Sequence, residues 1–188
     1  MLNIPPELAQ APIAITHFGS SIWSYTWRSG GANSGGSTMF ARLGSSIKVS
    51  DLIRGVIIQS GNDACIILAE GMAGNERIFA ADFLTRRARE LGMTKSTFGN
   101  SNGLPDPANK MTVRELSKLA RHLILTYPDM YKLFAEREFT WNKIRQQNRN
   151  PLLNSLTGAD GLKTGYTKEG GYGMVGSAVQ HDTRLIVV

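Results

Sequence analysis

Two apolar segments, separated by a short polar break, constrain the fold of this chain more than any other feature. The first runs over 51–58 and the second over 63–72, with Gln59-Ser60-Gly61-Asn62 between them. We expect Ser50 to be the N-cap of the first segment and Gly74 to end the second, because glycine readily adopts the left-handed conformation at a helix C-terminus. The sequence therefore predicts two helices, joined by a sharp turn, of which the second is largely buried.

Two further helices are predicted in the middle of the chain. Apolar residues recur at three- and four-residue steps over 78–91, and Gly92 follows as a C-terminal cap. This pattern is typical of an amphipathic helix. Thr112 and Glu115 have the spacing of a capping box, and the helix that they open must stop before Pro128.

Strands are predicted where apolar and polar residues alternate. Such short patterns occur over 47–49 and 138–141. The last part of the chain, 172–179 and 183–188, is typical of a β-hairpin that turns at His181-Asp182. Helices and strands together predict a chain of the α/β class.

Composition excludes several kinds of function. With 188 residues, 41% of them hydrophobic, the chain can bury one sizeable core. The net charge of +6 is scattered, and the basic run at 86–89 has no interleaved aromatics, so we interpret it as a solvated helix face. The single Cys65 excludes an internal disulfide and is interpreted as a core residue, while His17, His122 and His181 lack metal-ligand spacing. We expect no metal, no cofactor and no nucleic-acid partner.

Two short motifs carry the candidate chemistry. Ser60-Gly61-Asn62 lies at the break between the apolar segments, and Lys163-Thr164-Gly165 comes just ahead of the C-terminal hairpin. Either motif alone is more often an ordinary turn or strand. In this order they match S-x-N and K-T-G, two of the three signatures of penicillin-binding proteins and related β-lactamases, the first being S-x-x-K.

The residue types in these motifs suit acyl transfer. Such an enzyme needs a nucleophile, a group that takes its proton, and donors aimed at the charge that develops on the carbonyl. Ser60 can relay a proton towards the leaving amine, and Asn62 can fix the substrate backbone with its amide. Lys163 supplies a cation for a terminal carboxylate, and Thr164 adds a hydroxyl donor. Gly165 leaves room for an extended peptide to pair with the strand edge.

The chain resembles the low-molecular-mass penicillin-binding proteins, which are the D-alanyl-D-alanine carboxypeptidases of serine peptidase family S11. The resemblance covers roughly Trp27 to Val188, well beyond the two motifs. It includes GGSTMF at 35–40, LIRGVIIQSGNDA at 52–64, GLPDP at 103–107, RNPLL at 149–153 and DGLKTGYT at 160–167.

The resemblance implies a fold, an activity and a ligand. The implied fold is an α/β fold of the β-lactamase/transpeptidase type, with a helical cluster carrying Ser60 packed on an antiparallel sheet that contains the Lys163 strand and the terminal hairpin. The implied enzyme is periplasmic and removes the terminal D-alanine from peptidoglycan stem peptides through an acyl-serine. β-Lactam antibiotics would acylate it as substrate mimics. Ser60 and Asn62 would form the second motif, and Lys163 would grip the terminal carboxylate or the β-lactam acid.

The S-x-x-K signature is the part of the pattern that does not fit. Its one literal match is Ser45-Ser46-Ile47-Lys48, which alternates like a strand. Side chains three apart on a strand point to opposite faces, so Lys48 could not serve Ser45, and we interpret the match as accidental. We therefore expect an atypical segment at 1–25, followed at 26–188 by a partial catalytic domain that is truncated at both ends.

The sequence also predicts neither a signal peptide nor a membrane span. It contains no run of about 18 apolar residues. Any membrane contact would come through segments that this sequence does not contain. Besides the carboxypeptidase, two hypotheses stay open: a catalytically inactive fragment or pseudoenzyme that still binds D-Ala-terminated peptides, and a structural module of the cell envelope.

Overall fold

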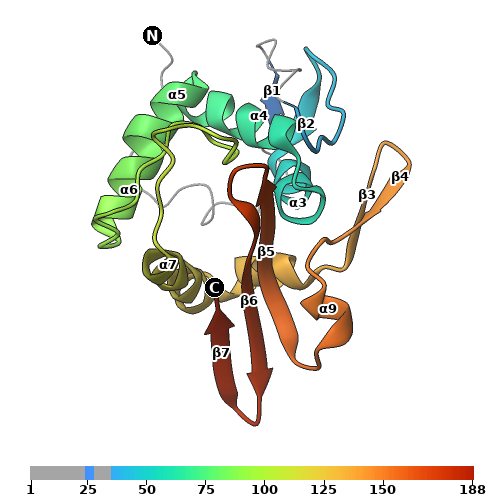
Figure 1. Cartoon of the computed structure of the whole chain (residues 1–188). Helices are drawn as coiled ribbons and strands as arrows, with labels where there is room; N and C mark the ends of the chain where they lie inside the picture. Colours follow the sequence, from blue (N-terminus) through green and yellow to red (C-terminus); the bar gives the residue numbers. More distant parts are fainter. Residues whose placement is uncertain (1–23, 28–34) are drawn as a thin grey trace.

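The computed structural model describes residues 24–27 and 35–188. Figure 1 shows a group of helices lying across one end of a sheet, with further helices beside the sheet. The helical segments are α3 (Val49–Gln59), α4 (Asn62–Ala73), α5 (Glu76–Ile78), a π-helical turn (Phe79–Leu84), α6 (Thr85–Glu90), α7 (Val113–Thr126), α8 (Pro128–Tyr131), a 3₁₀ turn (Lys132–Ala135) and α9 (Leu152–Ser155). The strands are β1 (Ser24–Thr26), β2 (Ser46–Lys48), β3 (Glu138–Trp141), β4 (Ile144–Gln147), β5 (Ala159–Thr167), β6 (Gly171–Gln180) and β7 (Thr183–Val187).

The two predicted helices at the polar break are confirmed as α3 and α4. Helix α4 ends where expected, with Gly74 in the left-handed conformation at φ 73°. Ser50 as N-cap was wrong, because α3 begins at Val49 and its N-cap is Lys48. The Val49 side chain is only 8% exposed, so its burial draws the start of the helix one residue closer to β2.

The amphipathic segment predicted over 78–91 is helical up to Glu90, with Leu91 as the C-cap, and Gly92 follows with a φ of 71°. A π-helical turn over 79–84 interrupts the regular pattern between α5 and α6. The Thr85 hydroxyl donates to the carbonyl of Ala80 at 3.2 Å, which satisfies a backbone acceptor in this turn. Nothing in the apolar spacing indicated this irregularity.

Half of the predicted capping box is present at the start of α7. The Thr112 hydroxyl accepts from the Glu115 N–H at 3.2 Å, as expected. The Glu115 carboxylate does not reach back to Thr112. It accepts instead from the backbone of Lys95 and the hydroxyl of Ser96, and the bond from Ser96 lowers the pKa of Glu115. Helix α7 ends at Thr126, before Pro128, as predicted.

The sheet that carries the second motif is antiparallel, in the order β5-β6-β7. The predicted terminal hairpin is confirmed, with β6 and β7 turning at His181 and Asp182, whose φ angles are 48° and 60°. Strands β3 and β2 are also confirmed, each in a separate two-stranded pair, although Val49 belongs to α3. Helix α7 contacts β6 and β7, so a helix packs on the antiparallel sheet, while the helices on either side of Ser60 contact mainly the short strand pairs β1–β2 and β3–β4.

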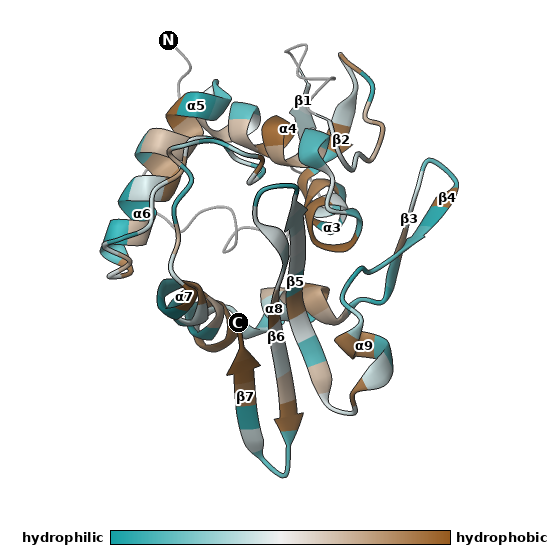
Figure 2. Ribbon diagram, in the orientation of Figure 1, coloured by the Kyte–Doolittle hydropathy of each residue, from teal (hydrophilic) through white to brown (hydrophobic). Residues whose placement is uncertain are grey.

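Two buried clusters hold these parts together. One lies where α3 and α4 meet the β1–β2 pair, and it consists of Trp27, Met39, Ile47, Leu52, Ala64 and Ile67. The other lies between α7, α8 and the sheet, and it consists of Ala120, Ile124, Tyr131, Leu162 and Val175. Figure 2 shows the hydrophobic residues of α3 and of the strands β6 and β7 in brown.

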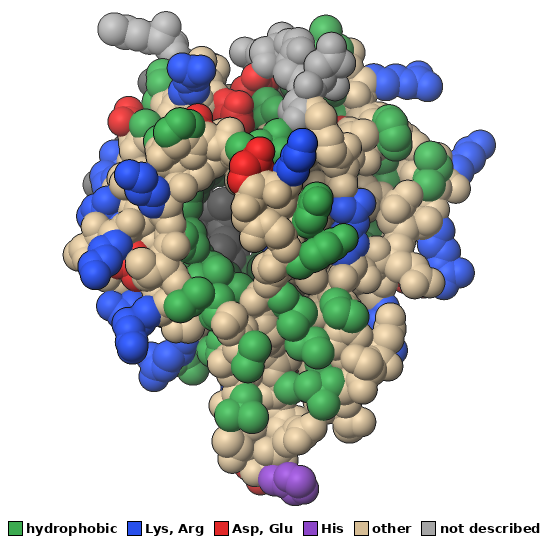
Figure 3. All heavy atoms as spheres, in the orientation of Figure 1, with side chains coloured by type: hydrophobic (Ala, Val, Ile, Leu, Met, Phe, Trp, Pro, Cys, Tyr) green, Lys and Arg blue, Asp and Glu red, His purple; other side chains and the backbone are tan. Residues whose placement is uncertain are grey.

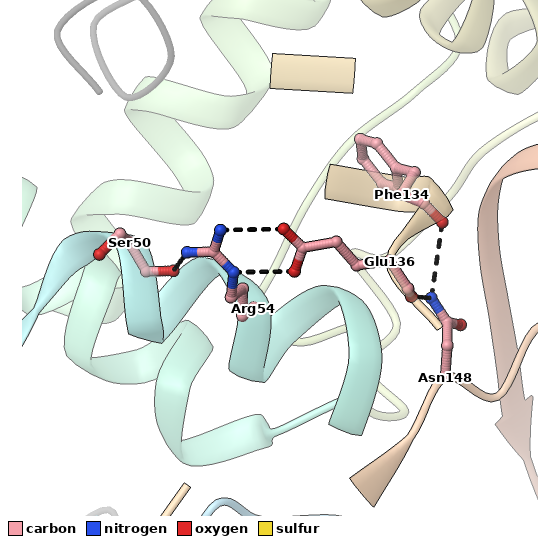
Figure 4. A network of polar contacts seen from close by, with 5 residues as sticks. All are labelled: Ser50, Arg54, Phe134, Glu136 and Asn148. Carbon is pink, nitrogen blue, oxygen red and sulfur yellow. Dashed lines mark hydrogen bonds and ion pairs between the residues drawn. The ribbon is translucent and has the colours of Figure 1, made fainter. Parts of the chain in front are cut away.

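An ion pair fixes α3 to the segment just before β3. Figure 4 shows Arg54 and Glu136 facing each other as a two-pronged pair, with Nε to Oε2 at 2.8 Å and Nη2 to Oε1 at 2.9 Å. The side-chain amide of Asn148 donates to the backbone carbonyl of Glu136 at 2.9 Å, and this bond anchors the backbone of Glu136. This arrangement orients the helix that ends at Ser60.

Candidate active site

Ser60 lies at the tight turn between α3 and α4. It is the C-cap of α3, with a left-handed backbone at φ 55°, and its N–H bonds to the carbonyl of Gly55. Gly61 donates to the same carbonyl at 3.0 Å and is the N-cap of α4. The polar break predicted from the sequence is therefore a tight turn of Ser60 and Gly61 between α3 and α4, in which Ser60 is half-buried.

Residues 35–41, which we call the strap, hold this turn from one side. The Asp63 carboxylate, only 3% exposed, accepts from the N–H groups of Met39 and Ala41 at 3.0 Å each. The Asn62 N–H donates to the carbonyl of Ser37 at 2.8 Å. These bonds make the turn part of a fixed unit with the strap.

Asn62 is engaged by the strap as well. Its side-chain Nδ2 donates to the carbonyl of Gly35 at 2.7 Å, and the residue is only 9% exposed. A Cβ on Gly36 would come within 2.8 Å of the same nitrogen, so the strap passes very close to it. The sequence had indicated a substrate contact for Asn62, whereas in this structure its amide binds the protein's own backbone.

Lys163 brings the second motif to the first. Its side chain leaves β5, and Nζ donates to the hydroxyl of Ser60, which is 103 residues away in the sequence. Nζ also donates to the carbonyl of Thr164 at 2.7 Å. Desolvation of the amine lowers the pKa of Lys163 from its ordinary value of 10.5 to about 8, and the nearby Arg149 acts in the same direction. The amine is thus held beside Ser60 in a state that is easily deprotonated.

The rest of the second motif lies on an open strand edge. Among the described residues, β5 pairs with β6 on one side and has no strand on the other. Gly165 is exposed, and a Cβ placed on it would meet nothing within 4 Å. Thr164 is half-buried beside it. Figure 3 shows the surface hollowed between the helices α5 to α7 and the β5–β6 hairpin.

Polar contacts brace β5 where it enters the site. Asp160 accepts both prongs of Arg184 from β7, at 2.9 and 2.7 Å, and it also accepts from the Tyr131 hydroxyl at 3.1 Å. The amide of the buried Asn150 donates to the carbonyl of Gly161 at 2.7 Å. The strand therefore reaches Lys163 in a fixed position.

Sequence reasoning assigned no role in the site to Arg149, and it interpreted Cys65 only as a core residue. Arg149 donates to the hydroxyl of Ser37 in the strap, and its charge also acts on Lys163. Cys65 lies one turn into α4, where burial raises its pKa to about 12. The family segment at 149–153 contained Arg149, but it did not indicate these contacts.

The Ser45 to Lys48 match has a different setting. Residues 46–48 form β2, as predicted, and the Ile47 side chain between them is 2% exposed. The Ser45 hydroxyl donates to the carbonyl of Arg42 at 2.6 Å, and Lys48 is exposed. Lys48 is thus a strand residue as expected, whereas Ser45 lies just before β2 and bonds to Arg42.

Other kinds of site receive no support from the described residues. None of their helices has the length and apolar character needed to cross a membrane. They also contain no group of three or more His, Cys, Asp or Glu side chains that could hold a metal ion. His122 and His181 lie far apart in the fold, on α7 and in the terminal turn, while His17 lies outside the described part.

Known proteins resemble this chain in sequence and in fold. Residues 16–188 match the family model described as D-alanyl-D-alanine carboxypeptidase. The chain belongs to this family. It is 46% identical over 164 residues to the D-alanyl-D-alanine carboxypeptidase DacC of Escherichia coli strain K12, a match that covers 86% of this chain and 41% of DacC.

Solved structures of the family have the same fold. Penicillin-binding protein 5 from Haemophilus influenzae is similar with a TM-score of 0.81 and 37% identity, over 88% of this chain and 49% of that one. Penicillin-binding protein D2 from Listeria monocytogenes, in its ampicillin-bound form, gives a TM-score of 0.68 and 28% identity, over 86% of this chain and 68% of that one. The predicted β-lactamase/transpeptidase-like fold is therefore confirmed. The chain spans less than half the length of DacC.

Proposed function

We propose that this chain provides the peptide-recognition part of a serine-type D-Ala-D-Ala carboxypeptidase. Its ligand is the D-Ala-D-Ala end of a peptidoglycan stem peptide, and β-lactam antibiotics bind as mimics of that end. The observation that carries the proposal is the contact between Lys163 and Ser60, which unites two motifs 103 residues apart. The family's work on the cell wall supports a periplasmic location.

Each candidate residue has a role in this proposal. Lys163 binds the terminal carboxylate as an ammonium, and Thr164 donates its hydroxyl to the same group. Gly165, on the open edge of β5, lets the peptide backbone pair with the strand. Ser60 relays a proton towards the leaving amine, and Asn62 aligns the substrate amide after exchanging its bond to Gly35.

The binding step can be tested directly by calorimetry with a tripeptide that ends in D-Ala-D-Ala. At pH 7 we expect reversible binding that weakens by about tenfold or more in Lys163→Ala, because a charge-assisted hydrogen bond contributes roughly 1.5–3 kcal/mol. Lys168→Ala is the matched control, since Lys168 is exposed in the turn between β5 and β6. The same peptide with a C-terminal amide should bind as weakly to the original chain as the free acid binds to Lys163→Ala.

The two other hypotheses predict different results. An inactive fragment or pseudoenzyme binds the peptide through Lys163 but releases no D-alanine, whereas an active carboxypeptidase releases it, and a coupled D-alanine assay measures the difference. A structural module shows no peptide binding that depends on Lys163. Equal affinities of Lys163→Ala and the original chain would therefore contradict the proposed recognition.

A further inference from the structure

Ser60 and Lys163 are arranged in a way that carboxylate recognition alone does not require. The amine of Lys163 contacts the Ser60 hydroxyl directly, at the junction of α3, α4 and β5. We propose that Ser60 is itself a nucleophile with Lys163 as its general base, and that the pair accepts acyl groups from neutral, activated esters. This activity goes beyond the proposed peptide recognition and does not rest on it.

The backbone at Ser60 is the first support for this assignment. A residue with a side chain at φ 55° is strained by roughly 1 kcal/mol, and such conformations persist where surrounding contacts impose them. Nucleophilic serines on tight, strained turns are a known solution, because the turn exposes the hydroxyl. Here the bonds of Gly61 and Asp63 to their neighbours hold the turn in place.

The second support is the position of the amine. Serine and lysine can form a catalytic pair without histidine, provided that the lysine is neutral. The burial of Lys163 favours the neutral form, and Arg149, from the segment before α9, favours it further. Its contact with the carbonyl of Thr164 needs only one N–H, so a neutral amine keeps that bond and turns its lone pair to Ser60.

Cys65 is the other nucleophile near this pair, and its surroundings disfavour it. Burial raises the pKa of its thiol to about 12, and the negative charges of Asp63 and Glu76 act in the same direction against the opposing effect of Lys163. The thiolate is therefore a minor species at pH 7 to 9. Ser60, in contrast, has its base in contact.

The proposed step conserves all atoms. The Ser60 Oγ forms a bond to the acyl carbon, and its proton passes to the neutral Lys163 amine. The bond between the acyl carbon and the leaving oxygen breaks, and the proton on Lys163 is available to that oxygen. The products are an acyl-Ser60 ester and a free alcohol or phenol, with no redox change.

The contacts of the turn also limit the substrate class. The N–H groups of Gly61 and Asn62 already bond to Gly55 and Ser37, so they are not free to stabilise an oxyanion. Donors of this kind contribute a factor of about 10²–10³ to acyl transfer. Without them, the pair should accept esters whose leaving group is a stable anion, and it should not cleave peptides at a measurable rate.

This proposal has a pH signature that recognition does not share. The carboxylate binds the ammonium form of Lys163, which prevails below a pH of about 8. The general base is the amine, which prevails above that pH. Peptide binding should therefore weaken, and acylation of Ser60 should accelerate, as the pH rises from 7 to 9.

The test uses p-nitrophenyl acetate with the intact chain, followed by peptide mass mapping. We expect acetyl-Ser60, formed at a rate that rises through a pH of about 8. Ser60→Gly, which suits the left-handed backbone, should lower the rate of p-nitrophenol release at least about 100-fold, and so should Lys163→Arg, because arginine stays protonated. Ser45→Ala and Cys65→Ala are controls that should leave the rate unchanged, and circular dichroism verifies the fold of each variant.

Three results would overturn the proposal: acetyl groups on Lys163 or Cys65 in place of Ser60, a rate unaffected by Ser60→Gly, or no acetylation at pH 9. The nucleophilic pair and the recognition of D-Ala-D-Ala can fail separately. Acetyl-Ser60 without peptide binding removes only the recognition of D-Ala-D-Ala. Peptide binding through Lys163 without acetyl-Ser60 removes only the nucleophilic pair.

Discussion

The two halves of the site are held in place in different ways. The turn at Ser60 is enclosed, because the Asn62 N–H bonds to the strap and the buried Asp63 accepts from two N–H groups of the strap. The strand at Lys163 is braced near its start by Asp160 and then runs to an exposed end at the sheet edge. The comparison teaches that one half is rigid through buried polar contacts, while the other leaves its backbone accessible to a ligand.

The largest expected effect concerns the enclosed half. Asp63→Ala removes an acceptor that serves three N–H groups, those of Met39, Ala41 and Ala64. Leaving a buried donor unpaired costs about 1–3 kcal/mol, so we expect a loss of about 3–5 kcal/mol in the free energy of unfolding. Urea denaturation measures it. Asp82→Ala, at an exposed helical position, is the control, and an equal loss there would show that the turn is not specially held.

The next effect is an increase in stability. Because burial lowers the pKa of Lys163 to about 8, the unfolded chain binds more protons than the folded chain between pH 8 and 10.5. The stability of the original chain should therefore rise with pH across this window. Below the window the folded chain bears the full cost of burying the charged Lys163 ammonium. Lys163→Met should raise the free energy of unfolding at pH 7 by about 2 kcal/mol, with the gain disappearing above pH 10.5.

Thermal and urea unfolding at several pH values check this prediction. Lys168→Met, at the exposed hairpin turn, should show no such pH dependence. A gain in Lys163→Met that persists at pH 11 would mean that packing, and not the buried charge, stabilises the variant.

A smaller effect is expected at the ion pair that orients α3. Arg54 and Glu136 are each about one-third exposed, so screening by water reduces their contribution. We expect Glu136→Gln to lower the free energy of unfolding by about 1–2 kcal/mol, because both prongs of the guanidinium lose their charged partner. The pair between Arg145 and Glu138 is a matched control that is much more exposed. Glu138→Gln should change stability by no more than about 0.5 kcal/mol.

The smallest effect belongs to the open edge. Gly165→Ala should leave stability within about 0.5 kcal/mol, since its Cβ enters free space. Gly161→Ala, on the same strand, would place a Cβ 2.3 Å from the Tyr131 hydroxyl and should destabilise by about 1–3 kcal/mol. If Gly165→Ala weakens peptide binding without this loss of stability, the edge is used by the ligand. Similar losses for both variants would contradict the view that this end of β5 is open.

Local patterns in the sequence predicted the elements of the fold well. The apolar segments on either side of Ser60 correctly predicted α3 and α4. Gly74 and Gly92 correctly predicted where helices end, because the backbone freedom of a single glycine decides such an end. The terminal hairpin followed from alternation around His181-Asp182. The start of α3 was missed at Ser50, since the burial of Val49 outweighed the capping preference.

Contacts between distant segments account for what the sequence did not predict. The bond from Asn62 to Gly35 spans 27 residues, and the pair of Arg54 and Glu136 spans 82. The Glu115 carboxylate does not form the expected capping-box bond, because it accepts from the hydroxyl of the buried Ser96, which lies 19 residues earlier in the sequence. Only the motifs linked Ser60 with Lys163, and they did so through resemblance to a family and not through any local rule.

The contact between Lys163 and Ser60 also has a consequence for the order of folding. It closes a loop of 103 residues, and loop closure of that length is entropically opposed until other contacts have already shortened the distance. Contacts of such high separation form late and slow the search for the native topology. Helices α3 and α4 can therefore form early, before the site is assembled. A reagent that reacts only with the assembled Lys163 and Ser60 pair would measure the rate of the last stage of folding.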